Sequence, residues 1–373
     1  MIYMKNLMAG FMLITVLAAN GSSASPEPFK PGAVWPDTDG KHINAHGGGI
    51  LFHDGVYYWF GEFKQGGRRG NQAYDGISCY TSTNLTTWKN EGIALAVEQE
   101  PASEIVPGCI MERPKVIYNK KTGKFVMWFH LELKGKGYDA ARTGVAISDT
   151  VTGPYTYLRS YRPNAGTWPV NMPQPAEGTP GPPEDDYMQY FKRDLAGGQM
   201  SRDMTLFVDD DGTAYHVHAA EENYTLHISR LSDDYTSFTD QWTRVIPGGH
   251  NEAPAIFKYN GKYYMITSGC TGWDPNAARL HVADSMLGEW TALGNPCIGE
   301  DADTTFTSQS TFVLPVQGLE GAFIFMADRW NPANQIDSRY IWLPIRFKDD
   351  VPYLQWSDEW DLGVFQQTGS SAQ

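Results

Sequence analysis

The chain has 373 residues and a formal net charge of -14, so we expect no nucleic-acid partner, because binding a phosphate backbone requires a basic face. It carries 20 Tyr, 17 Phe and 12 Trp, and aromatic side chains favour strands with large buried areas. Length and composition therefore favour an all-β protein, and a single all-β domain can reach this size.

Residues 1–24 have the order of a secretory signal peptide. Lys5 precedes an apolar run at 7–19, and small residues follow up to Ala24. The run is too short to span a membrane comfortably, and no other stretch is long enough, so we expect no membrane insertion. An uncleaved helix is the alternative. We predict an exported protein, periplasmic or extracellular, with a lead-in at 25–46, one domain at 47–368 and a tail at 369–373.

Four cysteines are present: Cys79, Cys109, Cys270 and Cys297. Their spacing has no CxxC or His-rich pattern typical of zinc, and we expect no cofactor and no metal site. An exported chain permits disulfides, for which three pairings are open. Cys270 with Cys297 would close the shortest plausible loop.

Five segments share one plan, in which a strand, a tight turn and a returning strand are followed by further strands. In the first segment, Asp54-Gly55 is a two-residue hairpin turn. The expected strands are 47–53, 56–62 and 76–82; 113–118, 124–130 and 143–148; 204–208, 213–218 and 225–229; 251–259, 262–265 and 279–283; and 310–314, 322–326, 340–343 and 353–356.

Five units of this kind predict an all-β, five-bladed β-propeller that forms a single domain. A β-sandwich built from the same hairpins is the alternative. In a propeller the first strand of each blade lines the central axis, so the residues that open these strands should converge at one mouth. The opening residues are His46, Glu112, Asp203, Glu252 and Gln309.

The segment 162–187 interrupts the repeats. It contains Pro163, Pro169, Pro173, Pro175 and 180–183, which is Pro-Gly-Pro-Pro. Proline removes backbone donors and fixes φ, so the segment should not form regular sheet. It joins the second unit to the third on the face where the opening residues gather, and we expect a binding rim there with Trp168 as a stacking residue.

Glu112, Asp203 and Glu252 should share the mouth with Gln309, and with Glu62 at the end of the second strand. Carboxylates around one polar pocket repel each other, so at least one should keep its proton near neutral pH. Cleavage of a glycosidic bond requires such an acid, and inversion also requires a base that directs water.

Glu252 is the best acid candidate, because Pro254 holds the strand entry extended and aromatic surroundings could raise the pKa of the acid. Asp203 could adjust the charge on Glu252 or form a structural pair with Arg202. Glu112 precedes Arg113-Pro114 and could serve as base or as a ligand for a sugar hydroxyl.

The layout of the units, the run from Ser201 to Gly212 (SRDMTLFVDDDG) and the run from Asn251 to Pro254 (NEAP) resemble glycoside hydrolase family 43. The resemblance covers about 47–356. It implies an inverting enzyme on plant polysaccharides, with an Asp base, an Asp that tunes the pKa and a Glu acid. Asp203 matches the tuning Asp and Glu252 matches the acid.

The first unit departs from that pattern, because 44–47 reads Asn-Ala-His-Gly where the family places its base Asp. In this it is similar to the exo-β-1,3-galactanase subgroup. That similarity implies that Gln309 holds the attacking water, that Glu112 contacts the terminal galactose, and that Glu62 and Asn223 make further sugar contacts. His46 stays open as an alternative base.

The sequence therefore predicts an inverting, exo-acting glycoside hydrolase that releases galactose from the β-1,3-galactan backbone of arabinogalactan-type glycans. The expected partner is a polysaccharide or oligosaccharide, and we expect a monomer. Two alternatives remain open: another activity of the family, such as α-L-arabinofuranosidase or β-xylosidase, and a propeller that binds sugars without cleaving them.

Overall fold

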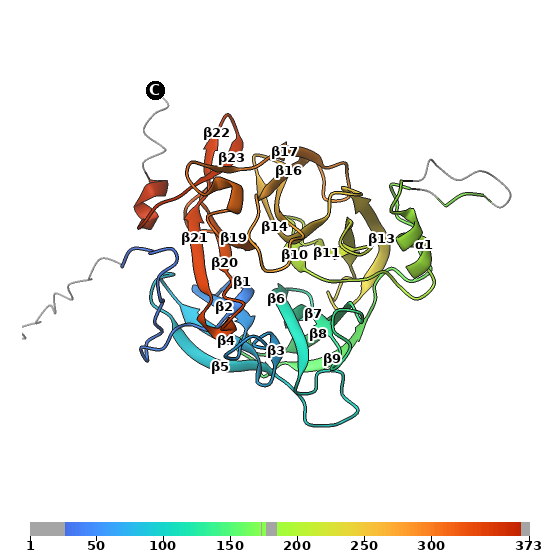
Figure 1. Cartoon of the computed structure of the whole chain (residues 1–373), viewed down its shortest axis with the longest axis horizontal. Helices are drawn as coiled ribbons and strands as arrows, with labels where there is room; N and C mark the ends of the chain where they lie inside the picture. The colour runs from blue at the N-terminus through green and yellow to red at the C-terminus, as the bar shows by residue number, and fades with distance from the viewer. Residues whose placement is uncertain (1–26, 173, 177–184, 367–373) are drawn as a thin grey trace, which may run out of the picture.

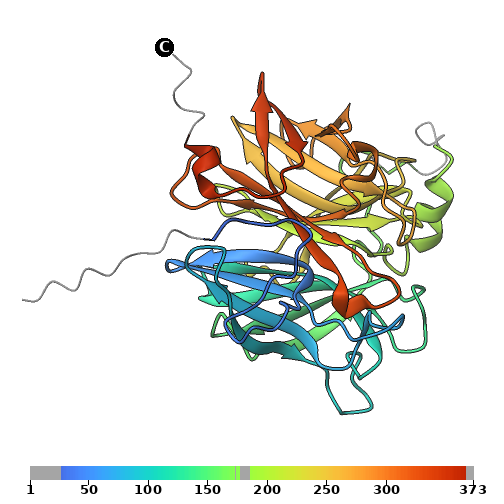
Figure 2. The same ribbon diagram turned by 60° about the vertical axis from the view of Figure 1, so that its left-hand side comes forward.

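The computed structural model describes residues 27–172, 174–176 and 185–366. The predicted signal peptide at 1–24 and the tail at 369–373 lie outside the described residues. Figure 1 shows small sheets set side by side around a common centre, and Figure 2 shows the same sheets from a view turned by 60°. Within the described ranges, no helix is long and apolar enough to cross a membrane.

Four of the sheets contain four or five strands each. The first holds β1 (His46–His53), β2 (Val56–Glu62), β4 (Gly76–Ser82) and β5 (Lys89–Ala96). The second holds β3 (Gln72–Ala73), β6 (Cys109–Asn119), β7 (Lys124–Glu132), β8 (Arg142–Ser148) and β9 (Thr156–Tyr161). The third holds β10 (Met204–Val208), β11 (Ala214–Ala220), β12 (Thr225–Leu231) and β13 (Phe238–Val245). The fourth holds β14 (Asn251–Tyr259), β15 (Lys262–Gly269), β16 (Arg279–Ala283) and β17 (Thr291–Gly294).

The other two sheets have three strands each. One holds β19 (Gln309–Pro315), β20 (Phe323–Arg329) and β21 (Arg339–Pro344), and the other holds β18 (Cys297–Ile298), β23 (Val351–Gln355) and β22 (Arg346–Lys348). The helical elements are α1 (Met188–Asp194) and the short 3-10 helices η1 (Ala302–Thr304), η2 (Gln335–Asp337) and η3 (Leu362–Phe365).

The prediction of five blades is wrong, because the described residues form a propeller of six sheets. The fifth unit was expected to end with a fourth strand at 353–356. Instead β21 ends at Pro344, and Asp349 and Asp350 turn the chain so that β23 pairs with β22. β23 also pairs in parallel with β18, so a separate sheet forms beside β21. Six small sheets also rule out the two-layered sandwich.

Tight turns set the register of the hairpins. At Asp54-Gly55 φ is 47° and 83°, and at Asn260-Gly261 it is 47° and 75°. Positive φ at both central residues matches the right-handed twist of paired strands, and Asp-Gly and Asn-Gly tolerate it best. The pairs His53–Val56 and Tyr259–Lys262 follow directly from these turns.

The core consists of apolar layers between neighbouring sheets. Phe60 and Ile77 of the first sheet pack against Met127 and Phe129 of the second, and each is 0 % exposed. Similar layers join the second sheet to the third and the third to the fourth. Because one small sheet cannot bury both faces alone, this face-to-face packing is what stabilises the ring.

The lead-in closes the molecule against its C-terminal part. Phe29 pairs with Trp360 through two backbone hydrogen bonds of 2.7 and 3.1 Å, and their rings stack with centroids 4.3 Å apart. Both rings belong to the same apolar cluster as Trp59 of the first sheet and Trp342 of β21. The two ends of the described chain therefore join the first sheet to the fifth.

Three of the inner strands carry a β-bulge near the end at which they begin. The pairing shifts after His46, Glu112 and Glu252. The next residue in each case has positive φ, 60° at Gly47, 55° at Arg113 and 51° at Ala253. A bulge re-aims a side chain and leaves backbone groups unpaired, so these strands can direct polar groups out of the ladder at the same end.

The segment after β9 was expected to form a rim with Trp168 over the mouth. Trp168 packs instead against Phe191 of α1 in the cluster that also holds Trp242 of β13. The backbone N–H of Val170 donates to the carbonyl of Trp242 over 2.8 Å. This part of the segment therefore lies along the outer strand of the third sheet, because that strand offers backbone acceptors and an apolar surface. Pro173 and 180–183 lie outside the described residues.

The four cysteines are all free thiols, so the suggested Cys270–Cys297 disulfide is not present. Cys79, Cys109 and Cys297 are buried among apolar side chains of the core. Burial raises the pKa of Cys109 and of Cys297 to about 12. These thiols therefore behave as small apolar core residues.

Two neighbouring histidines are buried in the third sheet. His216 and His218 are 0 % exposed, and their Nδ1 atoms lie 3.2 Å apart. Burial lowers the pKa of His216 to about 3, and burial followed by the neighbouring His216 and His227 lowers the pKa of His218 well below 6.5. Both side chains are therefore neutral in the folded protein at pH 7.

We predict that the free energy of unfolding falls as pH is lowered below about 6.5. There the unfolded chain takes up protons on His216 and His218, and the folded chain does so only near their lowered pKa values. Each such histidine contributes a slope of up to about 1.4 kcal/mol per pH unit. Urea unfolding between pH 7.5 and 4.5 should show that the free energy of unfolding changes less with pH in His218→Asn than in the wild type. Parallel curves for His218→Asn and wild type would contradict this.

Candidate active site

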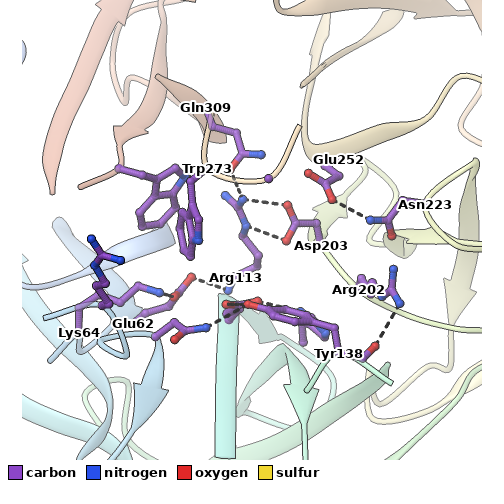
Figure 3. A pocket seen from close by; sticks show the side chains of 16 residues that line it. Glu62, Lys64, Arg113, Tyr138, Arg202, Asp203, Asn223, Glu252, Trp273 and Gln309 are labelled. Atoms are coloured by element: carbon purple, nitrogen blue, oxygen red, sulfur yellow. Dashed lines mark hydrogen bonds and ion pairs between the residues drawn. The ribbon is translucent and has the colours of Figure 1, made fainter. Parts of the chain in front are cut away.

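A polar cavity of about 320 Å³ lies where the inner strands β1, β6, β10, β14 and β19 begin (Figure 3). Each of these strands packs against its neighbours around the ring, so residues near the strand starts come together from distant parts of the sequence. The lining residues are Glu62, Lys64, Arg68, Asn71, Glu112, Arg113, His130, Tyr138, Arg202, Asp203, Asn223, Glu252, Gly272, Trp273, Gln309 and Trp330.

Arg113 lies at the centre of the cavity (Figure 3). Its Nε and Nη2 atoms donate to the two oxygens of Asp203 over 3.0 and 2.8 Å, and Nη2 also donates to Oε1 of Gln309 over 2.6 Å. Its Nη1 donates to the carbonyl of Ser310. The bidentate pair with Asp203 raises the pKa of Arg113 despite its burial. One permanent cation therefore connects the second, third and fifth sheets.

Glu252 is the second residue of β14, and two neighbouring side chains contact one of its oxygens. Its Oε1 accepts a hydrogen bond from Nδ2 of Asn223 over 2.7 Å, and Sγ of Cys270 lies 3.0 Å from the same oxygen. Burial, and then the negative charge of Asp203, raises the pKa of Glu252 to about 7. At neutral pH a substantial share of this carboxyl group therefore carries its proton.

Glu112 lies in β6 just before its bulge and is ionised in the same cavity. Its Oε1 accepts from the hydroxyl of Tyr138 over 2.8 Å, and its Oε2 lies 3.2 Å from Nδ1 of His130. Although burial acts to raise the pKa of Glu112, the hydrogen bond and charge of His130 outweigh it and bring the value to about 2. His130 also contacts the buried Glu132 over 2.9 Å, and its two carboxylate partners, opposed by burial, raise its pKa to about 9.

Glu62 lies at the end of β2 next to Lys64, with which it forms a buried ion pair. Burial raises the pKa of Glu62, and the charge of Lys64 opposes that rise. Oε1 of Glu62 accepts from the backbone N–H of Arg113 over 3.0 Å, which satisfies the bulge in β6. A side chain on Gly47 would place its Cβ 1.9 Å from that oxygen, so only glycine fits there.

Gln309 opens β19, and its amide has a fixed orientation. Oε1 accepts from Arg113 and from the indole Nε1–H of Trp330 over 2.9 Å, and Nε2 donates to Oγ of Ser268 over 3.0 Å. Arg113 and Trp330 can only donate, so a flipped amide would oppose donor to donor. The two bonds use both lone pairs of Oε1, and the group open to a ligand is the second N–H of Nε2.

Two left-handed turns lead into the cavity. The first covers Glu221, Glu222 and Asn223, with φ of 53°, 56° and 67°, and the second covers Thr305, Phe306 and Thr307, with φ of 54°, 57° and 57°. Such conformations cost about 1–2 kcal/mol for each residue with a side chain.

Buried bonds hold both turns in place. Arg244, His227 and Thr225 donate to the carboxylate of Glu221, and the hydroxyl of Thr305 donates to a backbone carbonyl over 2.7 Å. The strained backbone therefore places Asn223 and, just after the second turn, Gln309 at fixed positions.

Two residues predicted for the site, His46 and Trp168, do not line the cavity. His46 is 0 % exposed, because its ring stacks on Tyr340 and its Nδ1 lies 3.1 Å from Asp328. This buried pair holds His46 outside the cavity lining, so His46 is not positioned to act as a base. Trp168 lies in the apolar cluster over β13 described above and does not reach the cavity. Glu62, Glu112, Asp203, Asn223, Glu252 and Gln309 all line it.

Several lining residues were not foreseen, among them Arg113, His130, Tyr138, Trp273 and Trp330. Arg113 directly follows Glu112 in the sequence. Because three carboxylates were predicted at the same mouth, a cation at this position could have been expected to pair with them. His130 pairs with Glu112 across its hairpin as Glu62 pairs with His46 in the first unit, so the repeat also indicated it. Tyr138 and Trp273 lie on irregular loops, where the repeat carries no positional information.

Glu112, His130 and Asp203 each offer a ligand atom within 4.8 Å of the others, a spacing compatible with a metal ion. Arg113 occupies both oxygens of Asp203, and Tyr138 and His130 occupy those of Glu112. The donor atoms of this group are therefore already engaged by protein hydrogen bonds and ion pairs.

Comparison with known proteins places this site in a family. Residues 181–359 match the model of glycosyl hydrolases family 43. A solved family 43 β-1,3-galactosidase with galactodeoxynojirimycin is 58% identical with a TM-score of 0.85, and the alignment covers 90% of this chain and 100% of that one. The chain belongs to glycoside hydrolase family 43.

Two further family structures are similar along most of the chain. An exo-β-1,3-galactanase from Phanerochaete chrysosporium with β-1,3-galactotriose is 35% identical with a TM-score of 0.75, covering 92% of this chain and 70% of that one. An exo-β-1,3-galactanase from Clostridium thermocellum is 38% identical with a TM-score of 0.75, covering 89% and 66%.

Curated relatives with other activities are more distant. A β-D-galactofuranosidase from Aspergillus niger is 27% identical over 147 residues, 38% of this chain and 42% of that protein. A xylosidase/arabinosidase from Bacteroides ovatus is 29% identical over 196 residues, 48% of this chain and 55% of that protein. The chain thus aligns with about half the length of these curated relatives.

The charge of Asp203 contributes to the raised pKa of Glu252, and this can be tested without turnover. In Asp203→Asn the pKa of Glu252 should fall from about 7 by about one unit or more, because the like charge is removed and Arg113 is left unneutralised. Infrared difference spectra across pH 4–9 would follow the carboxyl band that Glu252→Gln removes.

The control for this titration is Asp233→Asn, which removes a surface carboxylate paired with Lys121 and should leave the band unchanged. An unchanged or higher pKa of Glu252 in Asp203→Asn would contradict the assigned cause.

Proposed function

We propose that this family 43 enzyme is an inverting, exo-acting hydrolase that releases galactose from β-1,3-galactan backbones of arabinogalactan-type glycans. The observation that carries the proposal is a carboxyl group with a pKa of about 7, Glu252, in a cavity whose other carboxylates are engaged by cations or donors. The 58% identity to a β-1,3-galactosidase over the whole of that chain supports the choice of substrate.

In the proposed reaction Glu252 is the general acid. Its proton passes to the glycosidic oxygen, the bond from that oxygen to the anomeric carbon breaks with its electron pair on the oxygen, and a water oxygen bonds to the anomeric carbon from the opposite face. The water then loses a proton to solvent, and Glu252 regains one from solvent. Because protonated Glu252 is required, activity should fall as pH rises through about 7.

Gln309 is proposed to orient the attacking water by donating its free N–H. Its oxygen already accepts from Arg113 and Trp330, and neither partner can take up a proton. A proton relay through the imidic form of the amide is therefore unfavourable in this arrangement. Orientation of water against an oxocarbenium-like centre supplies the catalytic effect instead.

The remaining polar residues are proposed to recognise the terminal galactose. Glu112 and Glu62 present carboxylate oxygens, Asn223 presents an amide, and Trp273 and Trp330 present aromatic faces around one cavity. The rings of Trp273 and Trp330 meet edge to face, with centroids 5.7 Å apart. Asp203 is proposed to keep the pKa of Glu252 high through its charge.

We also propose that residues 1–24 are a signal peptide and that the enzyme is exported, to the periplasm or the cell exterior, as a monomer. The order of charge, apolar run and small residues at 1–24 supports export. Sequencing the N-terminus of the protein recovered outside the cytoplasm, and measuring its mass in solution, would test both points.

A substrate panel tests the proposed activity. Incubated with β-1,3-galactan, arabinoxylan and arabinan, the protein should release galactose from the galactan alone, and proton NMR should detect the α-anomer first because the linkage is inverted. Glu252→Gln should lose about 10²–10⁴-fold in turnover and retain binding of galactose oligosaccharides.

Each alternative predicts another outcome of that panel. Release of arabinose or xylose would favour another family activity, such as an arabinofuranosidase or β-xylosidase. Binding of galactan without any release would favour a sugar-binding propeller, and near-normal activity of Glu252→Gln would remove Glu252 from the acid role.

The role of Gln309 is tested by comparing Gln309→Ala with Gln309→Glu. If the side chain orients water through its N–H, both variants should lose orders of magnitude in kcat, since neither offers that donor. If it acts as the base, Gln309→Glu should keep or exceed wild-type kcat, which would contradict the proposal. Circular dichroism melting would check that both variants are folded.

A further inference from the structure

The end of β15 and the residue that follows it contact both of the proposed reacting side chains. Ser268 and Cys270 are two residues apart, so they project to the same side of the extended chain. Oγ of Ser268 accepts from Nε2 of Gln309, and Sγ of Cys270 lies 3.0 Å from Oε1 of Glu252. The register explains this placement, because Ser268 pairs directly with Glu252 across the hairpin.

Both neighbours of Glu252 at this point are donors to one oxygen. Nδ2 of Asn223 donates to Oε1 over 2.7 Å and lies 3.5 Å from Sγ of Cys270, so the three groups form one contact cluster. Burial, and then the charge of Glu252, raises the pKa of the half-buried Cys270 thiol to about 11. The sulfur therefore keeps its hydrogen and can donate it to the carboxyl oxygen.

We propose that Cys270 is a positioning residue which, together with Asn223, holds Oε1 of Glu252 as an acceptor, so that the acid proton is carried by Oε2. A protonated carboxyl group has one carbonyl oxygen and one hydroxyl oxygen, and two donors on Oε1 make that oxygen the carbonyl one. The proton then leaves from Oε2 to the glycosidic oxygen, and the bonds from Asn223 and Cys270 stabilise the carboxylate that remains. This inference rests on the proposed function of Glu252.

Besides Cys270, charged groups also change the pKa of Glu252. Asp203, from the loop before β10, raises the pKa of the carboxyl group, and Arg113 and Arg202 lower it. The thiol of Cys270 lowers it as well, because it donates to the charged form. Removal of that one donor should therefore raise the pKa of Glu252 while the other charges stay in place.

The test compares Cys270→Ala with Cys270→Ser, measuring kcat/KM against pH on β-1,3-galactan oligosaccharides. Cys270→Ala should move the high-pH limb upward by about 0.5–1 pH unit and lower kcat several-fold, since a donor to the carboxylate is lost. Cys270→Ser offers an O–H donor and should restore both. With an aryl β-galactoside whose phenol leaves without protonation, the loss in kcat should disappear.

Cys297→Ala, which removes a buried thiol of the core around β18, serves as the control and should keep the wild-type limb. A wild-type limb in Cys270→Ala, or a Cys270→Ser variant that behaves like Cys270→Ala, would overturn the positioning role, and melting curves would confirm that each variant is folded. Failure of the proposed function is distinguishable, because Glu252→Gln would then remain active whatever the Cys270 variants do.

Discussion

The cavity depends on one buried cation, Arg113. An unpaired guanidinium in this position would be very unfavourable, so the surrounding sheets must supply acceptors for it. They do so with the carboxylate of Asp203, the amide oxygen of Gln309 and the carbonyl of Ser310. Arg113 also acts on residues that it does not contact directly. It partly neutralises Asp203 and so limits how strongly Asp203 raises the pKa of Glu252. It also fixes the amide of Gln309, which determines that the N–H edge faces a ligand.

The bulges explain why acidic residues surround this cation. Each bulge frees a backbone N–H, and a carboxylate from a neighbouring sheet accepts it: Asp328 for Gly47, Glu62 for Arg113, and Asp203 for Ala253, over 2.7 to 3.1 Å. The carboxylates that accept these backbone N–H groups therefore stabilise the fold, and Glu62 and Asp203 also line the cavity. A carboxylate that ties two sheets together is also held rigidly in the cavity, which is the preorganisation that a site for charged transition states requires.

Local patterns predicted most strands, because Asp54-Gly55 and Asn260-Gly261 specify hairpins through their own backbone preferences. The count of sheets failed where pairing is not local: β18 and β23 are joined in parallel across more than fifty residues, and no turn motif encodes that contact. The site shows the same difference between what local patterns predict and what they do not. Repeat position identified Glu112, Asp203, Glu252 and Gln309 as lining residues, whereas Tyr138 and Trp273 come from loops, and His46 is buried by contacts with β20 and β21.

The division of roles among the carboxyl groups follows from their partners rather than from their positions in the repeat. Glu112 and Glu252 lie just before the bulges of equivalent inner strands, yet their pKa values are about 2 and about 7. Glu112 faces a protonated imidazole and a phenol, so its charged form is stabilised. Glu252 faces the negative charge of Asp203, with an amide and a thiol as its hydrogen-bond partners, so its proton is retained. A repeated fold therefore supplies several similar carboxyl groups, and the second layer of side chains decides which of them can act as an acid.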